Sequence, residues 1–341
     1  MGVSKSKQIF RIVLLLGTIT SLFFVPWLLV KAWILPLPDS IQAQADEAVD
    51  HGFDGMIVYI DQGKEEPKFY ASGWHDRVKK IPAKPDALFK IASIAKLYNA
   101  VAITKLVHSN RLSLDKSIAD YFPEFADRIE NSDKITLKHL VQHRSGIPNY
   151  SDHPGYWGNP PETTLEHLEL IFDLPANFEP GTDYEYCNTN YLLIAEIMEK
   201  ELGYGSFIYI ENEILTPLNL TNTFENLSKV NMDDVMSGYH VGYGEDLKPG
   251  EWGMLATAED VGKFVRALND GSVFKEGEQE IYSSIYEYKH SGWVPGYQSF
   301  AEYFEDIDAV VVTFYNTTDE KLYMWNLSEI INSRIVKLIS N

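Results

Sequence analysis

The sequence predicts an α+β fold, an α/β sandwich in which both chain ends build one antiparallel sheet around a mostly helical insertion. Short apolar segments with strand character lie near both termini, whereas residues 93–268 alternate between helical periodicity and loops. An uncharged apolar run precedes the first of these strands. This run predicts a transmembrane helix in front of the globular part.

The apolar run covers residues 12–30 and reads IVLLLGTITSLFFVPWLLV, without a single charge. Its length approaches the roughly 20 residues that a membrane-spanning helix needs, and no small-residue cleavage pattern follows it. Lys5, Lys7 and Arg11 precede the run, so the positive-inside rule places the N-terminus in the cytoplasm. We therefore expect four segments: a cytoplasmic stub (1–11), an uncleaved single-pass anchor in the cell membrane (12–30), a stalk (31–40) and a periplasmic or extracellular domain (41–341).

Strand-like segments occur on both sides of the helical middle, where β-branched and aromatic residues are frequent and short polar turns intervene. On the N-terminal side, the pattern predicts a helix over 41–52 and strands over 55–62 and 67–74. On the C-terminal side, it predicts strands over 284–292, 297–304 and 309–316, and a closing helix over 324–339.

The middle of the chain contains segments with helical spacing of apolar residues, over 134–142, 190–203 and 257–268. Another helix is expected to begin at Ser93. Its apolar residues occur on nearly every side, and a helix of this kind lies in the centre of a protein rather than at its surface. We therefore expect Lys96, which this helix carries, to be buried.

Composition limits the partners of the chain. Its 341 residues include 49 Asp and Glu but only 29 Lys and Arg, which gives a net charge of −20. Such an acidic protein is a poor ligand for nucleic acid or for an anionic membrane surface. The single cysteine, Cys187, cannot form an internal disulfide, and we expect it to be a small buried filler.

The stretch FKIASIAKLYNA, residues 89–100, places Ser93 and Lys96 inside an apolar segment. Positions i and i+3 share one face of a helix, so the hydroxyl and the amine would meet. Burial disfavours the charged form of the amine, and a neutral amine beside a serine hydroxyl activates it as a nucleophile. An isolated Ser-x-x-Lys is more often a helix cap with a lysine that reaches solvent, so further motifs must decide.

Two more short motifs follow in order, Tyr186-Cys187-Asn188 and His290-Ser291-Gly292, the second on a predicted strand. Together with Ser-x-x-Lys they resemble the penicillin-recognising serine hydrolases. Tyr-x-Asn as the second motif is similar to that of the class C β-lactamases and the related D-Ala-D-Ala carboxypeptidases, D-aminopeptidases and esterases. The segments LVQHRSGIP (140–148) and MLATAEDVGKFVRAL (254–268) match the same branch. The resemblance covers residues 41–341 and implies a β-lactamase/transpeptidase-like fold.

The resemblance assigns chemical roles to three side chains. It implies that Ser93 forms the acyl-enzyme and that Lys96 withdraws or shuttles the serine proton. It also implies that Tyr186 acts as a general base when nearby positive charge, such as that of Lys96, favours the phenolate. Asn188 offers one acceptor and two donors, which suits a residue that holds both Lys96 and a substrate amide.

The third motif is expected to bind substrate through His290, Ser291 and Gly292. The backbone N–H groups of Ser93 and Trp293 would form the oxyanion hole. Gly292 would leave room for a substrate that lies along the strand edge. Most β-lactamases have lysine where this chain has His290, and histidine is fully charged only below about pH 6.5. His290 is therefore expected to anchor a substrate carboxylate, such as that of penicillin, less firmly at neutral pH than a lysine would.

Other candidate sites are weaker. His139 and His143 are spaced at i and i+4, but HLVQH lacks the glutamate of H-E-x-x-H, so we expect no metal and assign His143 to the loop that follows it. No G-x-S-x-G elbow, P-loop or G-x-G-x-x-G is present, and no cofactor is expected. Trp252, Trp293 and Tyr297 line the acyl site or belong to the core; the sequence leaves both interpretations open.

The sequence therefore predicts a membrane-anchored extracytoplasmic serine hydrolase that cleaves an amide or ester bond through an acyl-Ser93 intermediate. Candidate substrates are small molecules or peptides: a cell-wall peptide of D-Ala-D-Ala type, a D-amino-acid amide, a β-lactam or a small ester. The alternative is a penicillin-binding sensor or binding module with little turnover. The complete set of three motifs and the short segment before Ile12 argue against this alternative.

Overall fold

A six-stranded antiparallel sheet combines both ends of the chain, in the order β3-β2-β1-β10-β9-β8. The computed structural model describes residues 5–251 and 253–340. Strand β1 pairs with β10 from the other end of the chain, and Met56 lies opposite Tyr315 in this register. The predicted α+β class, with one sheet built from both termini, is confirmed.

The main sheet consists of β1 (Gly55–Gln62), β2 (Lys68–Asp76), β3 (Ile81–Pro82), β8 (His290–Val294), β9 (Tyr297–Phe304) and β10 (Ala309–Tyr315). Two smaller sheets join β4 (Phe89–Lys90), β7 (Leu255–Ala256) and β5 (Thr223–Phe224), and β11 (Thr317–Thr318) with β6 (Tyr239–His240).

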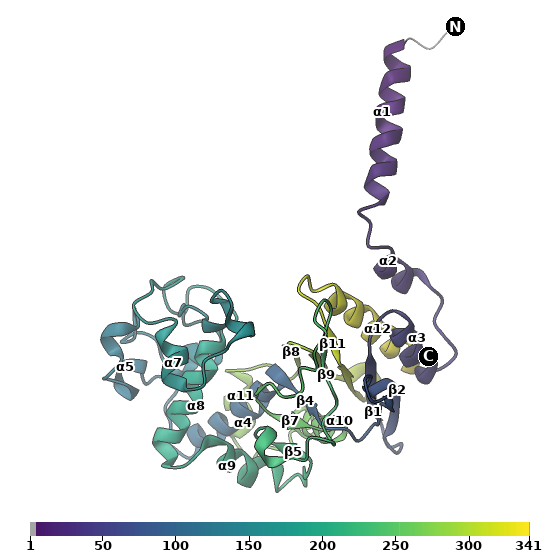
Figure 1. Cartoon of the computed structure of the whole chain (residues 1–341). Coiled ribbons are helices and arrows are strands. Elements are labelled where there is room, and N and C mark those ends of the chain that lie inside the picture. Colours follow the sequence, from purple (N-terminus) through teal and green to yellow (C-terminus); the bar gives the residue numbers. More distant parts are fainter. Residues whose placement is uncertain (1–4, 252, 341) are drawn as a thin grey trace.

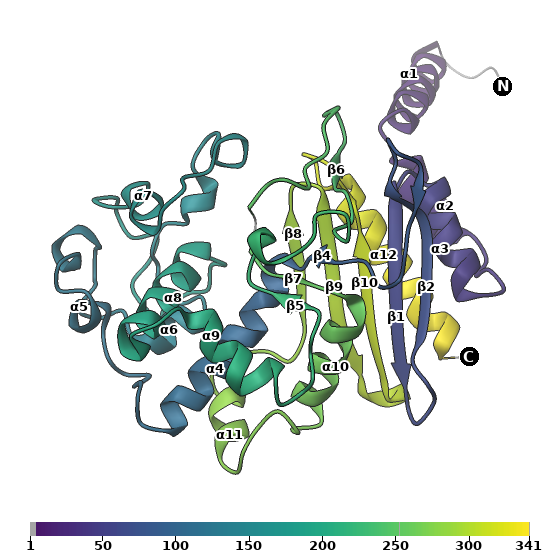
Figure 2. The same cartoon turned by 60° about the horizontal axis from the view of Figure 1, so that its bottom comes forward.

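Helices cover both faces of the main sheet. One face packs against α3 (Ile41–Asp50) and α12 (Tyr323–Ile339), and the other against α10 (Ala258–Asn269). Figure 2 shows the sheet between α10 and the pair α3 and α12. Apolar residues of alternate strand positions fill two separate core clusters, one on each face.

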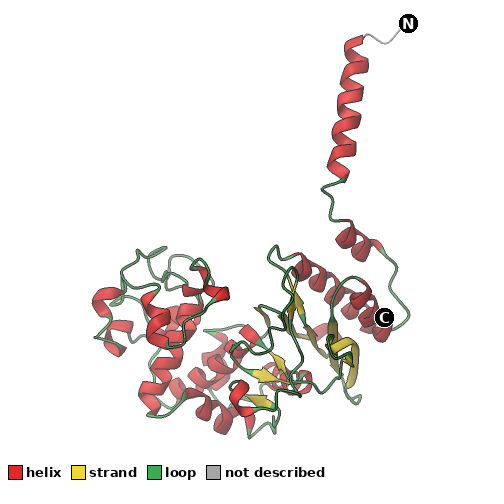
Figure 3. Ribbon diagram, in the orientation of Figure 1, coloured by secondary structure: helices red, strands yellow, loops and turns green. Residues whose placement is uncertain are grey.

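Among the described residues, seven further helices form the second half of the molecule, beside strand β8 (Figures 1 and 3). They are α4 (Ala95–His108), α5 (Ile118–Tyr121), α6 (Leu137–Val141), α7 (Thr164–Glu169), α8 (Asn188–Leu202), α9 (Ser206–Ile210) and α11 (Glu278–Ser283). Short 3₁₀ turns are η1 (Ala92–Ile94), η2 (Ala126–Arg128), η3 (Tyr150–Asp152), η4 (Tyr156–Gly158), η6 (Leu227–Lys229) and η7 (Glu305–Ile307), and a π turn is η5 (Glu211–Leu215).

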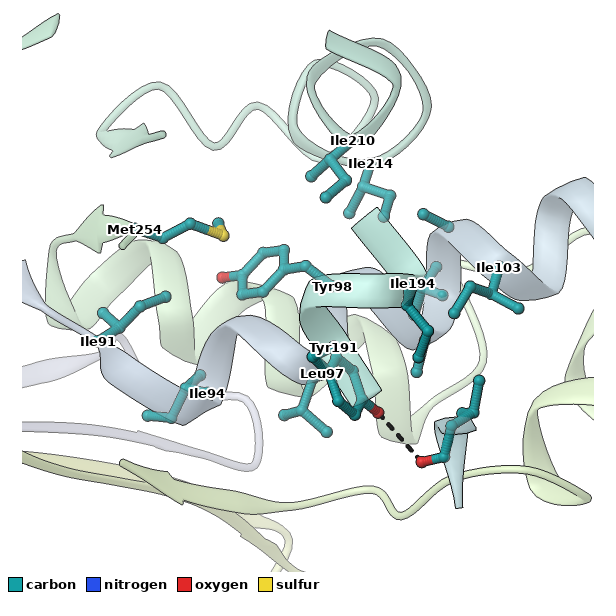
Figure 4. Packing of buried hydrophobic residues seen from close by; sticks show 14 of the residues in the cluster. Ile91, Ile94, Leu97, Tyr98, Ile103, Tyr191, Ile194, Ile210, Ile214 and Met254 are labelled. Carbon is teal, nitrogen blue, oxygen red and sulfur yellow. Dashed lines mark hydrogen bonds between the residues drawn. The ribbon is translucent and has the colours of Figure 1, made fainter. Parts of the chain in front are cut away.

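Helix α4 is the central helix of the molecule, as predicted. Its residues are buried over almost its whole length, and Lys96 is only 8% exposed. Figure 4 shows how side chains of α4 and the preceding turn pack with residues of α8, α9 and η5. The labelled members are Ile91, Ile94, Leu97, Tyr98, Ile103, Tyr191, Ile194, Ile210, Ile214 and Met254.

Two segments differ from the predicted secondary structure. Residues 284–289 were expected to begin a strand, but β8 begins only at His290. In this segment a side chain, and not a neighbouring strand, bonds a backbone carbonyl: the Tyr282 hydroxyl donates to the Glu287 carbonyl at 2.5 Å. The helix expected over 134–142 is confined to α6, because Thr136 caps its start and His143 adopts a φ of 55°, which ends it.

The N-terminal apolar run does not form one continuous helix. Helix α1 (Lys5–Leu22) ends before Pro26, and α2 (Trp27–Ile34) continues at an angle of 78°. No single helix in the described part of the chain is long and apolar enough for a membrane span, whereas this bent pair passes the same criteria of length and composition together. Proline accounts for the break, since it removes a backbone donor and clashes with the preceding turn.

Candidate active site

Ser93 lies in the 3₁₀ turn η1 that leads into α4, at a sharp bend of the backbone. The residue before it, Ala92, has a φ of 50°, in the left-handed region that costs a non-glycine residue energy. Contacts from elsewhere in the fold hold this bend: the Ser299 hydroxyl donates to the Ile91 carbonyl at 2.9 Å, and the Ile91 N–H donates to the Met254 carbonyl at 3.1 Å. The tertiary structure therefore stabilises a strained turn at the expected nucleophile.

Lys96 meets Ser93 as the i, i+3 spacing predicts. Its Nζ donates to Ser93 Oγ at 3.3 Å and to Asn188 Oδ1 at 2.9 Å. The rings of Tyr186 and Tyr191 lie 5.0 and 5.2 Å from the same nitrogen. No carboxylate of the residues described here forms an ion pair with Lys96, so a hydroxyl, an amide oxygen and two aromatic rings are its partners.

Tyr186 brings the second motif to the nucleophile. Its Oη lies 2.5 Å from Ser93 Oγ, which is hydrogen-bonding distance for two hydroxyl groups. Because Lys96 contacts the same serine and lies over the tyrosine ring, the three side chains form one connected group. A proton on Ser93 Oγ can pass directly to the phenol oxygen in this geometry.

Asn188 begins α8 and is held on three sides. Its Oδ1 accepts from Lys96, its Nδ2 donates to Ser151 Oγ at 3.0 Å, and its backbone N–H donates to Asn149 Oδ1 at 3.0 Å. The loop with Asn149 and Ser151 thus fixes the asparagine that fixes the lysine. Neither loop residue was predicted as part of the site.

His290 lies at the start of β8 beside Tyr186, with only 7% of its side chain exposed. Its Nε2 lies 3.0 Å from the Tyr286 hydroxyl and its Nδ1 lies 2.5 Å from the Ser291 carbonyl oxygen. Burial, and then the nearby charge of Lys96, lower the pKa of His290 to about 4. The imidazole is therefore neutral near pH 7.

Gly292 is required by the close approach of β8 to the nucleophile turn. A Cβ at this position would lie 2.4 Å from both the Ile91 carbonyl oxygen and Ser299 Oγ. This contact inside the protein is a reason for glycine that the sequence did not reveal, and the expected space for a substrate along the strand stays a prediction. Ser291 pairs with Phe300 across the sheet, and its side chain borders the cavity described below. The Trp293 N–H follows in the same strand, and its part in an oxyanion hole stays a prediction.

Cys187 and His143 form the layer behind Tyr186. Cys187 is 2% exposed, and its Sγ donates to the Ile147 carbonyl at 3.3 Å, away from Ser93. Its expected place as a buried filler is confirmed. The Cys187 N–H donates to His143 Nδ1 at 3.0 Å, and the His143 ring stacks on that of Tyr186 with centroids 4.5 Å apart.

His143 was expected to serve only its own loop, so its contact with Tyr186 is a residue role that the sequence did not reveal. Burial, and then the charge of Lys96, lower its pKa to about 3, so the ring stays neutral. A neutral ring can accept the Cys187 N–H at Nδ1. His143 thereby fixes the backbone beside Tyr186 and supports one face of its ring. The left-handed backbone conformation of His143 places its ring in this position, and the sequence alone does not show that conformation.

A cavity of about 750 Å³ opens beside Tyr186, His290 and Ser291. It lies between α12 and the face of β8, β9 and β10 that packs against this helix. Its volume is typical of ligand-binding pockets. Its apolar lining includes Phe300, Phe304, Val311 and Val336. Charged side chains at its border include Lys289 and Glu302, which pair at 2.5 Å.

The remaining predicted positions have other contacts. Tyr297 is fully buried in the core and donates to the Met236 carbonyl at 2.8 Å. The Trp293 ring meets the edge of Trp157, with centroids 5.5 Å apart. His139 belongs to the capping box of α6, where its Nδ1 accepts from the Thr136 N–H. Trp252 lies outside the described residues.

Comparison with known proteins agrees with the fold and with the motifs. The sequence profile of the family described as Beta-lactamase matches residues 39–284, which is more than half of the chain. The chain belongs to the β-lactamase family. This places it among the serine hydrolases of the β-lactamase and penicillin-binding superfamily, as the motifs predicted.

Curated relatives of this β-lactamase-family chain are longer proteins. It is 29% identical over 195 residues to Protein flp of Staphylococcus aureus, which covers 55% of this chain and 39% of the relative. It is 27% identical over 198 residues to penicillin-binding protein 4* of Bacillus subtilis, which covers 55% of this chain and 42% of that protein. The chain thus spans about two fifths of the length of the curated relatives it matches.

Solved structures share the fold over nearly the whole chain. D-amino acid amidase from Ochrobactrum anthropi SV3 superposes with a TM-score of 0.77 at 23% identity, and the match covers 88% of this chain and 98% of that one. A penicillin-binding protein from Bacillus halodurans gives a TM-score of 0.72 at 21% identity, over 87% and 99% of the two chains. At these identities the likeness concerns the fold.

Proposed function

We propose that the protein hydrolyses an amide or ester bond through an acyl-enzyme on Ser93. The contact that carries this proposal is the 2.5 Å approach of Tyr186 Oη to Ser93 Oγ, with Lys96 hydrogen-bonded to the same serine. A serine hydroxyl becomes a nucleophile when an adjacent base accepts its proton. The connected group of Ser93, Lys96 and Tyr186 supplies that base.

The proposed reaction has two stages. Ser93 Oγ attacks the carbonyl carbon while its proton moves to the phenolate oxygen of Tyr186, which Lys96 stabilises. The tetrahedral oxyanion collapses, the bond to the leaving group breaks, and Tyr186 returns the proton to the leaving nitrogen or oxygen. Water then attacks the acyl-Ser93 ester while Tyr186 accepts its proton; the bond to Ser93 Oγ breaks, Tyr186 returns the proton to that oxygen, and the acid leaves. We assign the oxyanion hole to the N–H groups of Ser93 and Trp293.

The protonation state of His290 affects which substrates the site can bind. With a pKa of about 4, its imidazole carries almost no charge at neutral pH and offers a carboxylate no ion pair. The adjoining cavity has an apolar lining that includes Phe300 and Phe304. Among the candidate substrates, we therefore favour amides and esters that are uncharged at this end, such as D-amino-acid amides, over peptides with a terminal carboxylate.

The experiment is a screen of the full chain, purified in detergent, against D-amino-acid amides, p-nitrophenyl esters, nitrocefin and D-Ala-D-Ala peptides. Labelling with a fluorophosphonate or a fluorescent penicillin accompanies it. Ser93→Ala should abolish labelling and turnover, whereas the matched variant Ser291→Ala should only weaken them. Labelling that survives Ser93→Ala would contradict the nucleophile, and persistent labelling without turnover would favour the penicillin-binding sensor instead.

We also propose that the N-terminal segment is an uncleaved anchor and that the domain lies outside the cell membrane. Support comes from the uncharged run over 12–30, from the basic residues before it, and from the bent pair α1 and α2. Mass spectrometry of the membrane-extracted protein should find the residues before Ile12 still attached. A soluble mature chain that begins near Asp39 would contradict the anchor.

A further inference from the structure

The segment between α1 and the catalytic domain is packed on the domain. Helix α2 lies against α12, and its Ala32 is 1% exposed. Leu28 and Leu29 pack against the same apolar cluster as residues of α3 and α12. Residues 31–40, expected as a stalk, thus include the second half of α2 and the loop that joins it to α3.

Arg334 of α12 forms hydrogen bonds that hold this loop against the domain. Its guanidinium is buried and donates to the Leu35 carbonyl at 2.7 Å and to the Pro36 carbonyl at 2.8 Å. The same group donates to Gln44 Oε1 at 2.7 Å and pairs with Glu47 at 3.1 Å, both on α3. One side chain therefore ties α12, α3 and the loop after α2 together, so α2 is not free to swing relative to the domain.

Large apolar side chains of this segment and of the bend before it are exposed. We call them the aromatic patch, and its five members with their exposed fractions are Phe23 (84%), Phe24 (83%), Trp27 (56%), Trp33 (73%) and Ile34 (64%). Trp27, Lys31 and Ile34 recur at i, i+4 and i+7, on the side of α2 opposite the buried Ala32. An apolar surface of this kind marks a contact with a partner.

The bend between the two helices is held by a specific contact. The Trp27 indole N–H donates to the Leu22 carbonyl at 2.8 Å, which satisfies a carbonyl at the end of α1. The aromatic patch therefore begins directly where α1 ends, and Figure 1 shows α1 extending away from the domain at this point. The side chains of α1 are exposed along its whole length.

We propose that the aromatic patch lies in the headgroup region of a lipid bilayer, so that the catalytic domain is seated on the membrane surface by α2 instead of hanging from a flexible linker. The proposal rests on the anchoring proposed above. Helix α1 has 18 residues and is about 27 Å long, which by itself is short of the roughly 30 Å of the hydrocarbon core, so the apolar residues that follow it in the bent pair complete the span. Its basic residues all lie in its first half and can reach the far interface.

The occupant is lipid because the patch is continuous with the exposed apolar surface of α1. Tryptophan concentrates at the membrane interface, where its apolar ring and its polar N–H are both accommodated, and phenylalanine occurs on the apolar face of interfacial helices. Lys31, exposed on the same side of α2, offers an ammonium group to lipid phosphates. A second copy of the chain is the competing occupant, and the experiment separates the two.

The test uses single-cysteine variants of the full chain in a Cys187→Ser background, which removes the only native thiol. Nitroxide labels are placed at Ile34→Cys in the patch, at Leu14→Cys in α1 and at the exposed Val78→Cys on the domain. The variants are reconstituted in vesicles of phosphatidylcholine and phosphatidylglycerol. Accessibility of each label to lipid-dissolved oxygen and to an aqueous nickel complex is measured, and labelling of Ser93 by a fluorophosphonate checks that each variant is folded.

We expect the label at 34 to be more accessible to oxygen than to nickel and the label at 78 to show the reverse. Trp27→Ser with Trp33→Ser should shift the label at 34 towards nickel. A water-accessible label at 34 beside a lipid-buried label at 14 would overturn the seating but leave the anchor intact. Water accessibility at both positions would overturn both proposals, and dipolar broadening between labels at 34 would show a second copy in place of lipid.

Discussion

The two ends of helix α4 each bury a lysine, and the two lysines have opposite surroundings. At the C-terminal end, Lys105 is 4% exposed, pairs with Glu278 at 2.9 Å and also donates to the Val273 carbonyl. At the N-terminal end, Lys96 meets Ser93, Asn188 and two aromatic rings, and no carboxylate among the described residues pairs with it. The same helix thus carries one neutralised and one uncompensated cation.

The difference separates a structural lysine from a reactive one. A buried cation is costly unless a counter-ion is present, and Lys105 has one. A carboxylate beside Lys96 would compete with a tyrosine phenolate for the same charge. Its absence from the described surroundings leaves the ammonium available to stabilise Tyr186. The charge of Lys96 also helps to keep His143 and His290 neutral, because it lowers the pKa of both rings.

The largest effect is expected from Lys96→Met. This change removes the cation that favours the Tyr186 phenolate and the donor to Ser93, so acylation should slow by about 10⁴-fold, the upper end for a positioned proton-transfer group. The free energy of unfolding should stay constant or rise, because a buried charge without a counter-ion is replaced by an apolar chain. Single-turnover labelling and thermal unfolding measure the two quantities. Unchanged acylation would contradict the reactive role of this lysine.

Tyr186→Phe and Tyr191→Phe compare the two rings that flank Lys96. Loss of the Tyr186 hydroxyl removes the proton acceptor of Ser93, and the hydrolytic rate should fall by about 10³-fold. The Tyr191 hydroxyl donates to the Val141 carbonyl at 3.3 Å, as the dashed line in Figure 4 marks, and also has Tyr286 as a hydrogen-bond partner. Its removal should cost about 1 kcal/mol of stability and leave the rate within a few-fold of wild type. Equal rates for the two variants would remove the distinction between the rings.

Lys105→Met tests the structural end of the helix. It leaves Glu278 buried without its partner, so the free energy of unfolding should fall by about 3–5 kcal/mol while turnover per folded molecule stays constant. The control is the double variant Lys105→Met with Glu278→Gln, which removes both charges and should recover much of the loss. Chemical denaturation with parallel active-site titration measures both. A loss of turnover without a loss of stability would make Lys105 functional as well.

His290, near Lys96 at the N-terminal end of α4, makes the stability of the protein depend on pH. Its pKa is about 4 in the folded protein and about 6.5 in an unfolded chain. Between these values the unfolded state binds more protons, so stability is lost as the pH falls from about 6.5 to about 4, by about 3 kcal/mol in total. His290→Gln should reduce the slope in this pH range without removing it, because His143, whose pKa is lowered to about 3, contributes a loss of the same sign. Lys96→Met should also reduce the slope, because it removes a charge that lowers the pKa of His290.

The parts that local pattern determines were predictable from the sequence. Strands over 297–304 and 309–315 follow from β-branched and aromatic residues between turns, and the Ser93–Lys96 contact follows from the i, i+3 geometry of a helical turn. The burial of Lys96 followed from the apolar residues around it on α4. Each of these predictions depends on residues close together in the chain.

The parts that distant contacts determine were not predictable. The left-handed Ala92 depends on bonds to its neighbour Ile91 from Ser299 and Met254, far along the chain. The stacking of His143 on Tyr186 joins two loops, and no periodicity encodes it. Residues 284–289 have the composition of a strand, yet the Tyr282 hydroxyl of α11 donates to the Glu287 carbonyl there. Tertiary contacts override local preference at all these positions.

The smallest effect is expected from Cys187→Ser, which asks whether the reactive end of α4 depends on every residue of Tyr186-Cys187-Asn188. The thiol donates to the Ile147 carbonyl, and burial raises its pKa, so it stays protonated and unreactive at neutral pH. A serine hydroxyl can donate to the same carbonyl, and the bond from the Cys187 N–H to His143 does not involve the side chain. Stability should therefore change by less than about 1 kcal/mol, and turnover should be unaffected.

Thermal unfolding, turnover and treatment of the wild type with a thiol-blocking reagent are the measurements. If Cys187→Ser stopped turnover while Tyr186→Phe did not, the reactive group beside Lys96 would be the thiol, and the contrast between the two ends of α4 would have to be assigned to a different side chain.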